Sequence, residues 1–292
     1  MDDSDFLAGQ FEQHRTHLRA VSYRMLGSLS EADDAVQEAW VRLSRSDAEE
    51  IENLGGWLTT VVARVCLNML RARRTRQEEP LDGLRLPDPV VERLDGAHPE
   101  HEALLADSVG LALLVVLEQL SPAERLAFVL HDMFAVGFEE IARMLGRSPE
   151  AARQLASRAR RRVQGATPEG PADRARQRAA AEAFMAAARE GDFERLVAVL
   201  HPDVVLRADT GPDHSLQVTV GAEKVAGQAI WFRGTVPETD TMETVLVNGA
   251  PGVLRTRDGY PLSLVAFAAA GDRIVGMDII ADPERLVALG LG

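Results

Sequence analysis

The first part of the chain alternates apolar and polar positions with the spacing of amphipathic helices. In SEADDAVQEAWVRL the polar positions fall on one face of a helix, and an apolar stripe occupies the other. That stripe consists of Ala32, Ala35, Val36, Ala39, Trp40 and Leu43. Ser30, with Asp33 three residues later, predicts the start of this helix. Gly55-Gly56 predict a break before a second helix through WLTTVVARVCLNMLRARRTR. Residues 6–77 are therefore predicted to form an all-α domain.

Two further changes of pattern follow. Residues 78–106 combine four prolines with many acidic residues, which is typical of a linker, although the less random RLPDPV within it could dock on a neighbouring surface. Residues 107–164 return to helical periodicity, and Ser121-Pro122 has the cap-plus-proline order of a helix start. This third segment is predicted to form a second all-α domain.

A helix-turn-helix is predicted at the end of this domain. Residues 138–145 form a short helix, Gly146-Arg147 a turn, and Ser148-Pro149 the start of a second helix. The positions predicted to face inward in the second helix are Ala152, Leu155, Ala156, Ala159 and Val163. Those left outside are Arg153, Gln154, Ser157, Arg158, Arg161 and Arg162. Such a helix can lie in the major groove of DNA, but a basic amphipathic helix can equally be a solvated surface, so both interpretations stay open.

Residues 174–292 change from helical to strand patterns. AEAFMAAAREGDFERLVAVLHPDVVLRAD predicts two helices with a joint at Gly191-Asp192, followed by a strand. Four more strands are predicted from residue 241 to residue 280, separated by turns at Asn248-Gly249, Asp258-Gly259 and Gly271-Asp272. Helices followed by an antiparallel meander predict an α+β domain. The fold class is therefore multidomain, with two all-α domains before one α+β domain.

Two basic segments stand in a chain that is acidic overall. The sequence holds 45 Asp and Glu against 32 Lys and Arg, a formal charge of −13. Arg64 to Arg76 nevertheless contains five arginines and no acid, and Gly146 to Gly165 contains six arginines and one glutamate. Because charges beyond a Debye length of about 8–10 Å are screened, binding depends on the local field. Either segment can therefore attract nucleic acid despite the net charge.

Composition argues against several other classes of protein. Cys66 is the only cysteine, so neither an intrachain disulfide nor a cysteine-based zinc site is expected. No apolar run approaches the roughly 18 residues of a membrane span, and the acidic N-terminus lacks the basic-then-apolar order of a secretory signal. We expect a cytoplasmic protein with no membrane contact, no metal and no cofactor.

Taken together, these segments resemble an extracytoplasmic-function sigma factor of bacterial RNA polymerase. SEADDAVQEAWVRL resembles sigma region 2.2, WLTTVVARVCLNMLRARR resembles regions 2.3 and 2.4, and LSPAERLAFVLHDMFAVGFEEIARMLGRSPEAARQLASRARRRV resembles region 4. Residues 181–280 resemble the SnoaL-like domains, which share the cone-shaped fold of nuclear transport factor 2. RLPDPV resembles the linker motif of the sigma subfamily that carries such a domain, with Arg85 in place of the motif's tryptophan.

The resemblance implies an alternative sigma factor that directs core polymerase to promoters and is regulated by its fused C-terminal domain. The acidic face of Asp34, Gln37 and Glu38 would meet the β′ clamp helices, and region 4 would meet the β flap. The residues implied at the −10 promoter element are Trp57, Arg64, Asn68, Arg71, Arg73 and Arg74. Those implied at the −35 element are Ser148, Arg153, Gln154, Arg158 and Arg161. For Trp57 a place in the core, and for the acidic face a solvated surface, remain alternatives.

The C-terminal domain leaves further alternatives. Asp282, Pro283, Glu284, Arg285 and Leu286 resemble the terminal motif of the subfamily, and we expect them to form a regulatory segment. Cone-fold domains can also be enzymes, and the titratable residues that could meet in a pocket are His201, Asp203, Asp209, His214, Tyr260 and Asp278. None of their spacings is diagnostic, so no catalytic residue is assigned. A pocket that binds a small ligand, and an enzyme anchored to DNA by its helical half, are the remaining alternatives to a domain that positions the sigma regions.

Overall fold

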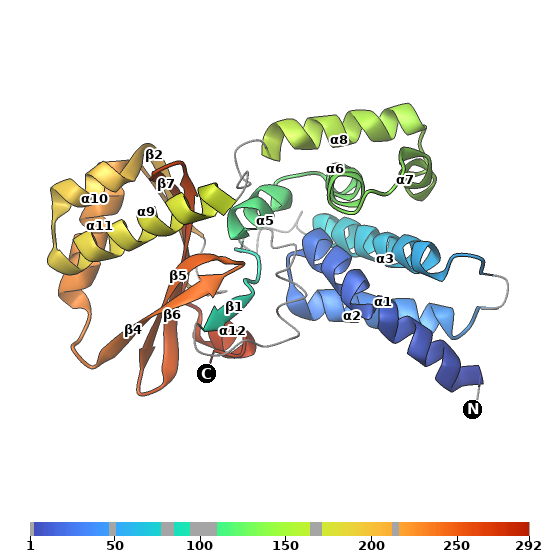
Figure 1. Cartoon of the computed structure of the whole chain (residues 1–292), viewed down its shortest axis with the longest axis horizontal. Helices are drawn as coiled ribbons and strands as arrows, with labels where there is room; N and C mark the ends of the chain where they lie inside the picture. The colour runs from blue at the N-terminus through green and yellow to red at the C-terminus, as the bar shows by residue number, and fades with distance from the viewer. Residues whose placement is uncertain are drawn as a thin grey trace. The chain divides into compact units, whose positions relative to one another are not determined.

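A computed structural model of the chain divides it into two compact units. The N-terminal unit comprises residues 1–81 and 114–164, and the C-terminal unit comprises residues 82–113 and 165–292. The structure describes residues 3–46, 51–76, 85–93, 110–163, 171–211 and 216–291 (Figure 1). Within those ranges no helix combines the length and apolar character needed to cross a membrane.

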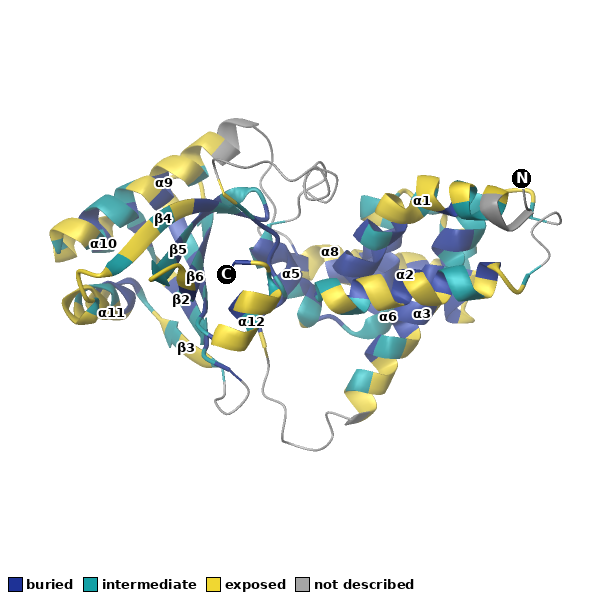
Figure 2. Ribbon diagram, turned by 90° about the horizontal axis from the view of Figure 1, so that it is seen from below, coloured by how far each residue is buried: buried dark blue, intermediate teal, exposed yellow. Residues whose placement is uncertain are grey.

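Three long helices form the first half of the N-terminal unit. They are α1 (Asp3–Leu26), α2 (Leu29–Leu43) and α3 (Leu54–Arg76), and each packs against the other two. Their inward faces are buried and their outward faces exposed (Figure 2). The predicted stripe of α2 is confirmed, because its aliphatic members are buried and Trp40 is half-buried with its ring centroid 5.1 Å from that of Phe11.

α2 is confirmed, but its N-cap is Ser28, two residues before the predicted Ser30. Gly27 ends α1 in the left-handed conformation, with φ of 68°, and α2 begins at Leu29, before Ser30. Asp33 does not take part in a capping box, because its carboxylate binds Arg19 Nε at 2.7 Å. The short connection after α1 therefore decides where α2 begins.

The predicted break at Gly55-Gly56 is also wrong, since both glycines lie in the first turn of α3. The side chain of Asn53 accepts a hydrogen bond from Gly56 N at 3.0 Å and so satisfies one of the free N–H groups at the helix start. A Cβ on Gly55 would lie 3.0 Å from His14 Cε1. Gly55 therefore allows α1 and α3 to approach each other closely.

Short helices form the second half of the N-terminal unit. α5 (Leu111–Glu118) is followed by α6 (Pro122–Phe128) and a π-helical turn, η2 (Val129–Met133). The predicted cap of α6 is confirmed, because Ser121 and Glu124 form a reciprocal capping box. The predicted helix-turn-helix is confirmed as well.

The two helices of that motif are α7 (Phe138–Leu145) and α8 (Pro149–Val163). Gly146 joins them in the left-handed conformation, with φ of 64° and ψ of 40°. A non-glycine residue is strained in this region, which explains the glycine at the turn.

Polar contacts join the two halves of the N-terminal unit. Arg125 on α6 is 2% exposed, and its Nη1 lies 2.9 Å both from the carbonyl oxygen of Met25 and from Glu118 Oε1. Thr60 on α3 donates a hydrogen bond of 2.9 Å to Glu140 on α7. The carbonyl at the end of α1 thus receives a charged donor from a helix about 100 residues later in the chain.

One seven-stranded sheet forms the centre of the C-terminal unit, in the order β1-β4-β5-β6-β7-β2-β3. The strands are β1 (Val91–Arg93), β2 (Leu200–Asp209), β3 (Gln217–Val220), β4 (Asp240–Val247), β5 (Ala250–Arg257), β6 (Tyr260–Ala270) and β7 (Arg273–Ile280). Neighbouring strands are antiparallel, except β2 and β7, which are parallel.

Helices pack on this sheet and confirm the predicted α+β class. α9 (Pro171–Glu190), α10 (Phe193–Val199) and α11 (Ala222–Thr235) share one apolar core with β2, β6 and β7 (Figure 1). α12 (Pro283–Ala288) follows the last strand.

The three predicted turns are confirmed between β4, β5, β6 and β7. Asn248 and Asp258 have φ of 50° and 51°, the left-handed values that tight hairpin turns require.

Candidate nucleic-acid interface

The helix-turn-helix presents α8 with one buried and one exposed face. All five residues predicted to face inward are buried, and the residues predicted to face outward are exposed. Ser148 Oγ accepts a hydrogen bond from Ala151 N at 3.2 Å, so this predicted DNA contact also caps α8. The start of α8, which would carry base-reading side chains, is therefore fixed by its own cap and by the turn at Gly146.

Acidic residues of α6 and η2 neutralise part of the basic helix α8. Glu124 lies 3.7 Å from Arg158 Nε and 3.2 Å from Arg162 Nη1, and Asp132 pairs with Arg160. Burial opposes ionisation of Glu124, but hydrogen bonds from the capping serine and the two arginine charges together lower its pKa. The stabilisation from ionised Glu124 is therefore present above its ordinary pKa of 4.5 and is lost as the pH falls below that value.

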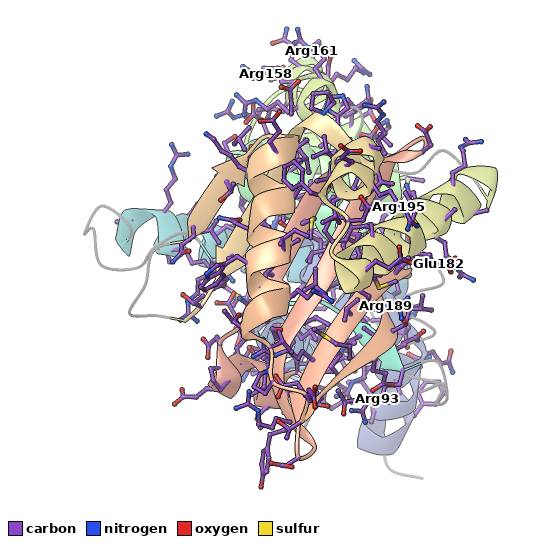
Figure 3. The ribbon with its side chains drawn as sticks, turned by 90° about the vertical axis from the view of Figure 1, so that its left-hand side faces the viewer. Arg93, Arg158, Arg161, Glu182, Arg189 and Arg195 are labelled. Carbon is purple, nitrogen blue, oxygen red and sulfur yellow. The ribbon has the colours of Figure 1, made fainter. Side chains whose placement is uncertain are left out.

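Arg153, Gln154 and Arg161 are exposed on α8 and lie outside this acidic cluster. The Arg153 side chain is 52% exposed and lies 3.6 Å from Glu139, a distance that allows exchange between this carboxylate and another anion. Arg161 has no ion pair within the described part of the chain, and it projects into solvent like Arg158 (Figure 3). The N–H groups of these side chains are therefore accessible to base edges and phosphates.

The residues predicted at the −10 element all lie on α3. Arg64, Asn68 and Arg71 are exposed and follow each other at helical spacing, so they form one stripe. Arg74 is exposed in the next turn. Trp57 is half-buried in the first turn of α3, so both interpretations of this tryptophan, as core and as a DNA contact, remain compatible with its position.

Arg73 has a structural role that the sequence did not reveal. Its guanidinium pairs with Glu31 near the start of α2, and its Nη1 donates to the carbonyl oxygen of Leu26 at 3.0 Å. Arg73 therefore joins the end of α1, the start of α2 and α3. The resemblance placed it with the DNA-facing residues, because the folding of α1 back onto α3 is not visible in a local pattern.

The acidic residues predicted to bind polymerase share the outer face of α2. Asp34, Gln37 and Glu38 are exposed, and Glu38 accepts a hydrogen bond from Arg42 Nε at 2.9 Å. The exposed face therefore carries two carboxylates, one of which is partly neutralised within its own helix.

In the C-terminal unit, Arg285 joins the terminal helix to the segment RLPDPV. Its Nε and Nη2 bind Asp88 Oδ1 at 3.0 and 2.8 Å, and its Nη1 binds Asp209 Oδ2 at 2.6 Å. Its Nη2 also donates to the carbonyl oxygen of Leu86. Val90 exchanges two hydrogen bonds with Asn248, and β1 then pairs with β4. RLPDPV is thus docked on the C-terminal unit.

The terminal segment itself is built into that unit. Asp282 caps α12 by accepting hydrogen bonds from Glu284 N and Arg285 N at 3.1 and 3.3 Å, and Pro283 occupies the first turn. Leu286 is completely buried. These residues hold the linker and the sheet together, which is the contact that a regulatory role would have to use.

Comparison with known proteins places these elements in a family. Residues 10–76 match the model of Sigma-70 region 2, and residues 110–163 match the model of Sigma-70, region 4. The ECF RNA polymerase sigma factor SigJ of Mycobacterium tuberculosis is 36% identical over 94% of this chain and 92% of its own. The crystal structure of SigJ covers all of both chains with a TM-score of 0.75 at 34% identity. The chain is an ECF RNA polymerase sigma factor.

A second relative also matches along nearly the whole chain. The probable ECF RNA polymerase sigma factor SigI of Mycobacterium tuberculosis is 32% identical over 98% of this chain and 97% of its own. The sigma factor is therefore a transcription initiation protein rather than an enzyme, and its partners are RNA polymerase core and promoter DNA. The helical bundle of α1–α3 is region 2, and α5–α8 form region 4.

The residues considered for catalysis have other contacts or positions. Asp209 binds Arg285, and Asp278 is buried and binds Arg207 at 2.9 Å, where burial raises the pKa of Asp278 despite the arginine. His201 Nδ1 accepts a hydrogen bond from the backbone of Asp203. Tyr260 is 71% exposed at a turn, and His214 lies outside the described residues.

We predict that Glu124→Gln increases the affinity of region 4 for DNA of any sequence. Glutamine keeps the shape and the capping hydrogen bond but releases Arg158 and Arg162 from a carboxylate. The plot of log affinity against log salt should become steeper by up to about 2, since each added phosphate contact contributes about 0.9. Fluorescence anisotropy with random duplex DNA measures both quantities.

Glu182→Gln is the matched control, because Glu182 is exposed on α9 and its loss changes the net charge equally (Figure 3). An equal rise in affinity in both variants would show that only the net charge matters.

We also predict that Asp88→Asn loosens the docked segment. The change weakens charged hydrogen bonds to Arg285, so local opening should become easier by about 1–2 kcal/mol, or roughly 5- to 30-fold. Trypsin should then cleave faster after Arg85 or Arg93, while Asp203→Asn, at an exposed position, should leave the rate unchanged. Unchanged cleavage of Asp88→Asn would mean that Arg285 does not hold this segment.

Proposed function

We propose that region 2 engages the β′ clamp helices of polymerase through the outer face of α2. Asp34, Gln37 and Glu38 give that face two exposed carboxylates, and the helices they would meet are basic in this family. Complementary charge of this kind mainly accelerates association and fixes register. Region 4 would meet the β flap in the same holoenzyme, in the cytoplasm where the polymerase acts.

We infer that α3 handles the −10 element with Arg64, Asn68, Arg71 and Arg74. The exposed arginines of this stripe suit the phosphates of a DNA strand, and the amide of Asn68 suits a base. Arg73 is left out of this surface, because its guanidinium is engaged with Glu31 and Leu26. Trp57 stands at the opposite end of the helix from Arg74, where it could stack on an unpaired base.

The observation that carries the proposal is the exposed face of α8 in a helix-turn-helix of region 4. Arg153 and Gln154 lie in the first half of the helix, where side chains of a recognition helix contact base edges. An arginine there can bind a guanine through two hydrogen bonds. Arg161 lies in the last turn, where a contact to phosphate is expected instead.

The C-terminal unit would regulate the sigma regions in the same chain. Its larger part, from α9 onward, follows α8 closely in sequence, and covalent linkage over so short a distance holds two segments at about millimolar effective concentration. Even a weak contact would then be well populated. The docked segment RLPDPV precedes region 4, so undocking it from Arg285 would change how freely region 4 can move.

A second role, the sensing of a small molecule, is favoured by one observation. The C-terminal unit contains a cavity of about 700 Å³ between its helices and its sheet, within the range of 300–1,000 Å³ that is usual for ligand sites. Of the residues weighed above for catalysis, those that the structure describes do not line this cavity.

Reconstituted holoenzyme is expected to start transcription at a defined promoter. Arg153→Ala should cost about 1–3 kcal/mol of discrimination at one base pair of the −35 element. Arg161→Ala should weaken binding to all DNA sequences alike and reduce the slope of log affinity against log salt by about one. Run-off transcription on genomic promoters, combined with competition binding, separates these effects. No transcript above that of core polymerase alone would contradict the proposal, and equal loss of discrimination in both variants would contradict the roles of the two arginines.

Regulation predicts that transcription changes when the C-terminal unit is altered. We expect Asp88→Asn and a chain that ends before Asp282 to raise activity, because both free the docked segment. A chain that ends after Gly170 is expected to lose activity if the unit also positions regions 2 and 4. Circular dichroism must show that each variant is folded. If all three variants have the transcription activity of the full chain, the C-terminal unit does not regulate the sigma regions.

A further inference from the structure

The cavity of the C-terminal unit is walled by the inward face of the sheet and by α9 and α11. Alternate residues of the strands face inward, and the strand register arranges them in rows. The first row is Leu206, Met277 and Phe267. The second is Thr244, Val253, Val265, Ile279 and Ala208. The third is Met242, Arg255 and Ser263.

These rows differ in polarity and in exposure. Every member of the first row is apolar and at most 8% exposed. The third row contains a cation and a hydroxyl, and its Met242 is 50% exposed. Phe232 on α11, which is 38% exposed, lies over Arg255 with 4.9 Å between the guanidinium carbon and the ring centroid. The cavity therefore runs from an apolar buried end to a polar end near solvent.

Arg255 is the cation of the third row, and Asp240 does not fully neutralise it. Asp240 lies 3.2 Å from its Nε, but the geometry is not that of a hydrogen bond, and this buried Nε has no acceptor within the described residues. Arg257 holds the same carboxylate with two hydrogen bonds, at 2.6 and 3.2 Å. This bidentate contact lowers the pKa of Asp240. Arg255 and Arg257 thus share Asp240, and because Arg257 takes both of its oxygens, Arg255 keeps N–H donors for a further anion.

Hydroxyl side chains also line this cavity, and one of them lies next to Arg255. Ser263 lies directly opposite Arg255 on the neighbouring strand, and it is 7% exposed. Thr210 borders the cavity at the end of β2, and its buried Oγ1 has no hydrogen-bond partner within the described residues. Buried polar groups without partners are rare in folded proteins. The unpartnered Nε of Arg255, with the Ser263 hydroxyl on the neighbouring strand, suits a bound anion.

We propose that the cavity binds an amphipathic monoanion, a carboxylate on an apolar body, with its head at Arg255 and Ser263 and its body along the first two rows. The head then lies at the more exposed end, where less of its hydration is lost. Arginine matches a carboxylate through two parallel hydrogen bonds. The proposed sensory role depends on this site, whereas binding itself requires neither polymerase nor DNA.

Isothermal titration calorimetry of the full chain with dodecanoate and dodecanol tests the proposal. The two probes share the apolar body and differ only in the head. We expect dodecanoate to bind the natural protein at least 10-fold more tightly than dodecanol does. Arg255→Met, which keeps an unbranched apolar stem but removes the guanidinium, should weaken dodecanoate binding about 10- to 100-fold, since hydrogen bonds to charged groups carry that much. The affinity for dodecanol should stay within about 3-fold.

Three further variants keep the test decisive. Arg273→Met removes an exposed arginine of the same sheet and should leave both affinities unchanged. Ser263→Ala should weaken the binding of dodecanoate about 5-fold without affecting that of dodecanol. This variant tests the head site if Arg255→Met fails to fold. Ala208→Phe fills the middle row and should abolish binding of both probes. Equal affinities for the two probes, no effect of Arg255→Met and Ser263→Ala, or no binding at all would each overturn the proposal.

Transcription assays separate this site from the regulatory role. If dodecanoate binds as expected but does not change run-off transcription, the ligand site is supported and the sensory role is contradicted. If transcription proceeds but no probe binds, the sigma function stands and the ligand class is wrong.

Discussion

The guanidinium of Arg285 is the contact on which the organisation of the C-terminal unit depends. Removing a charged group from water costs several kcal/mol, and this cost is offset only where good partners are present. Asp88, Asp209 and the carbonyl of Leu86 supply them. Because Asp88 and Leu86 belong to the segment between regions 2 and 4, that segment must stay docked for the arginine to keep these partners. A residue near the C-terminus therefore fixes a linker about 200 positions earlier.

Docking of the linker has a second consequence for the sheet. β1 pairs with β4, which would otherwise be an edge strand with unpaired N–H and C=O groups. The pairing starts where Val90 and Asn248 exchange two hydrogen bonds, and Asn248 is also the turn residue between β4 and β5. Release of the linker would expose that edge. Arg285 and the β1 pairing thus support the same docked state from two sides.

Much of the fold could be predicted from local patterns, because its signals are local. The turn at Gly146, the cap at Ser121 and the hairpin turns at Asn248 and Asp258 each follow from the chemistry of one or two residues. The elements that were missed depend on distant partners. β1 is three residues long and exists because β4 offers an edge.

The candidate site shows the same division. Periodicity identified the exposed face of α8, and the resemblance implied the residues on α3, but neither could tell which arginines are engaged inside the protein. Glu124 is 38 positions from Arg162 in sequence, and Glu31 is 42 positions from Arg73. A count of basic residues therefore overstates the charge available to DNA, and the pairing can be read only from the tertiary structure.

The packing of region 2 on region 4 sets a final limit on function. A unit of roughly 130 residues has a radius of gyration of about 14 Å, and hence a width of about 36 Å. The −10 and −35 elements lie roughly 25 base pairs apart, which is about 85 Å along the DNA axis. If α3 holds one element and α8 the other, the compact arrangement cannot reach both. The contacts of Arg125 with Met25 and of Thr60 with Glu140 must then break before initiation. The ring of Phe134 also contacts His17 and Arg24 on α1, so binding to polymerase must supply the free energy needed to separate the two regions.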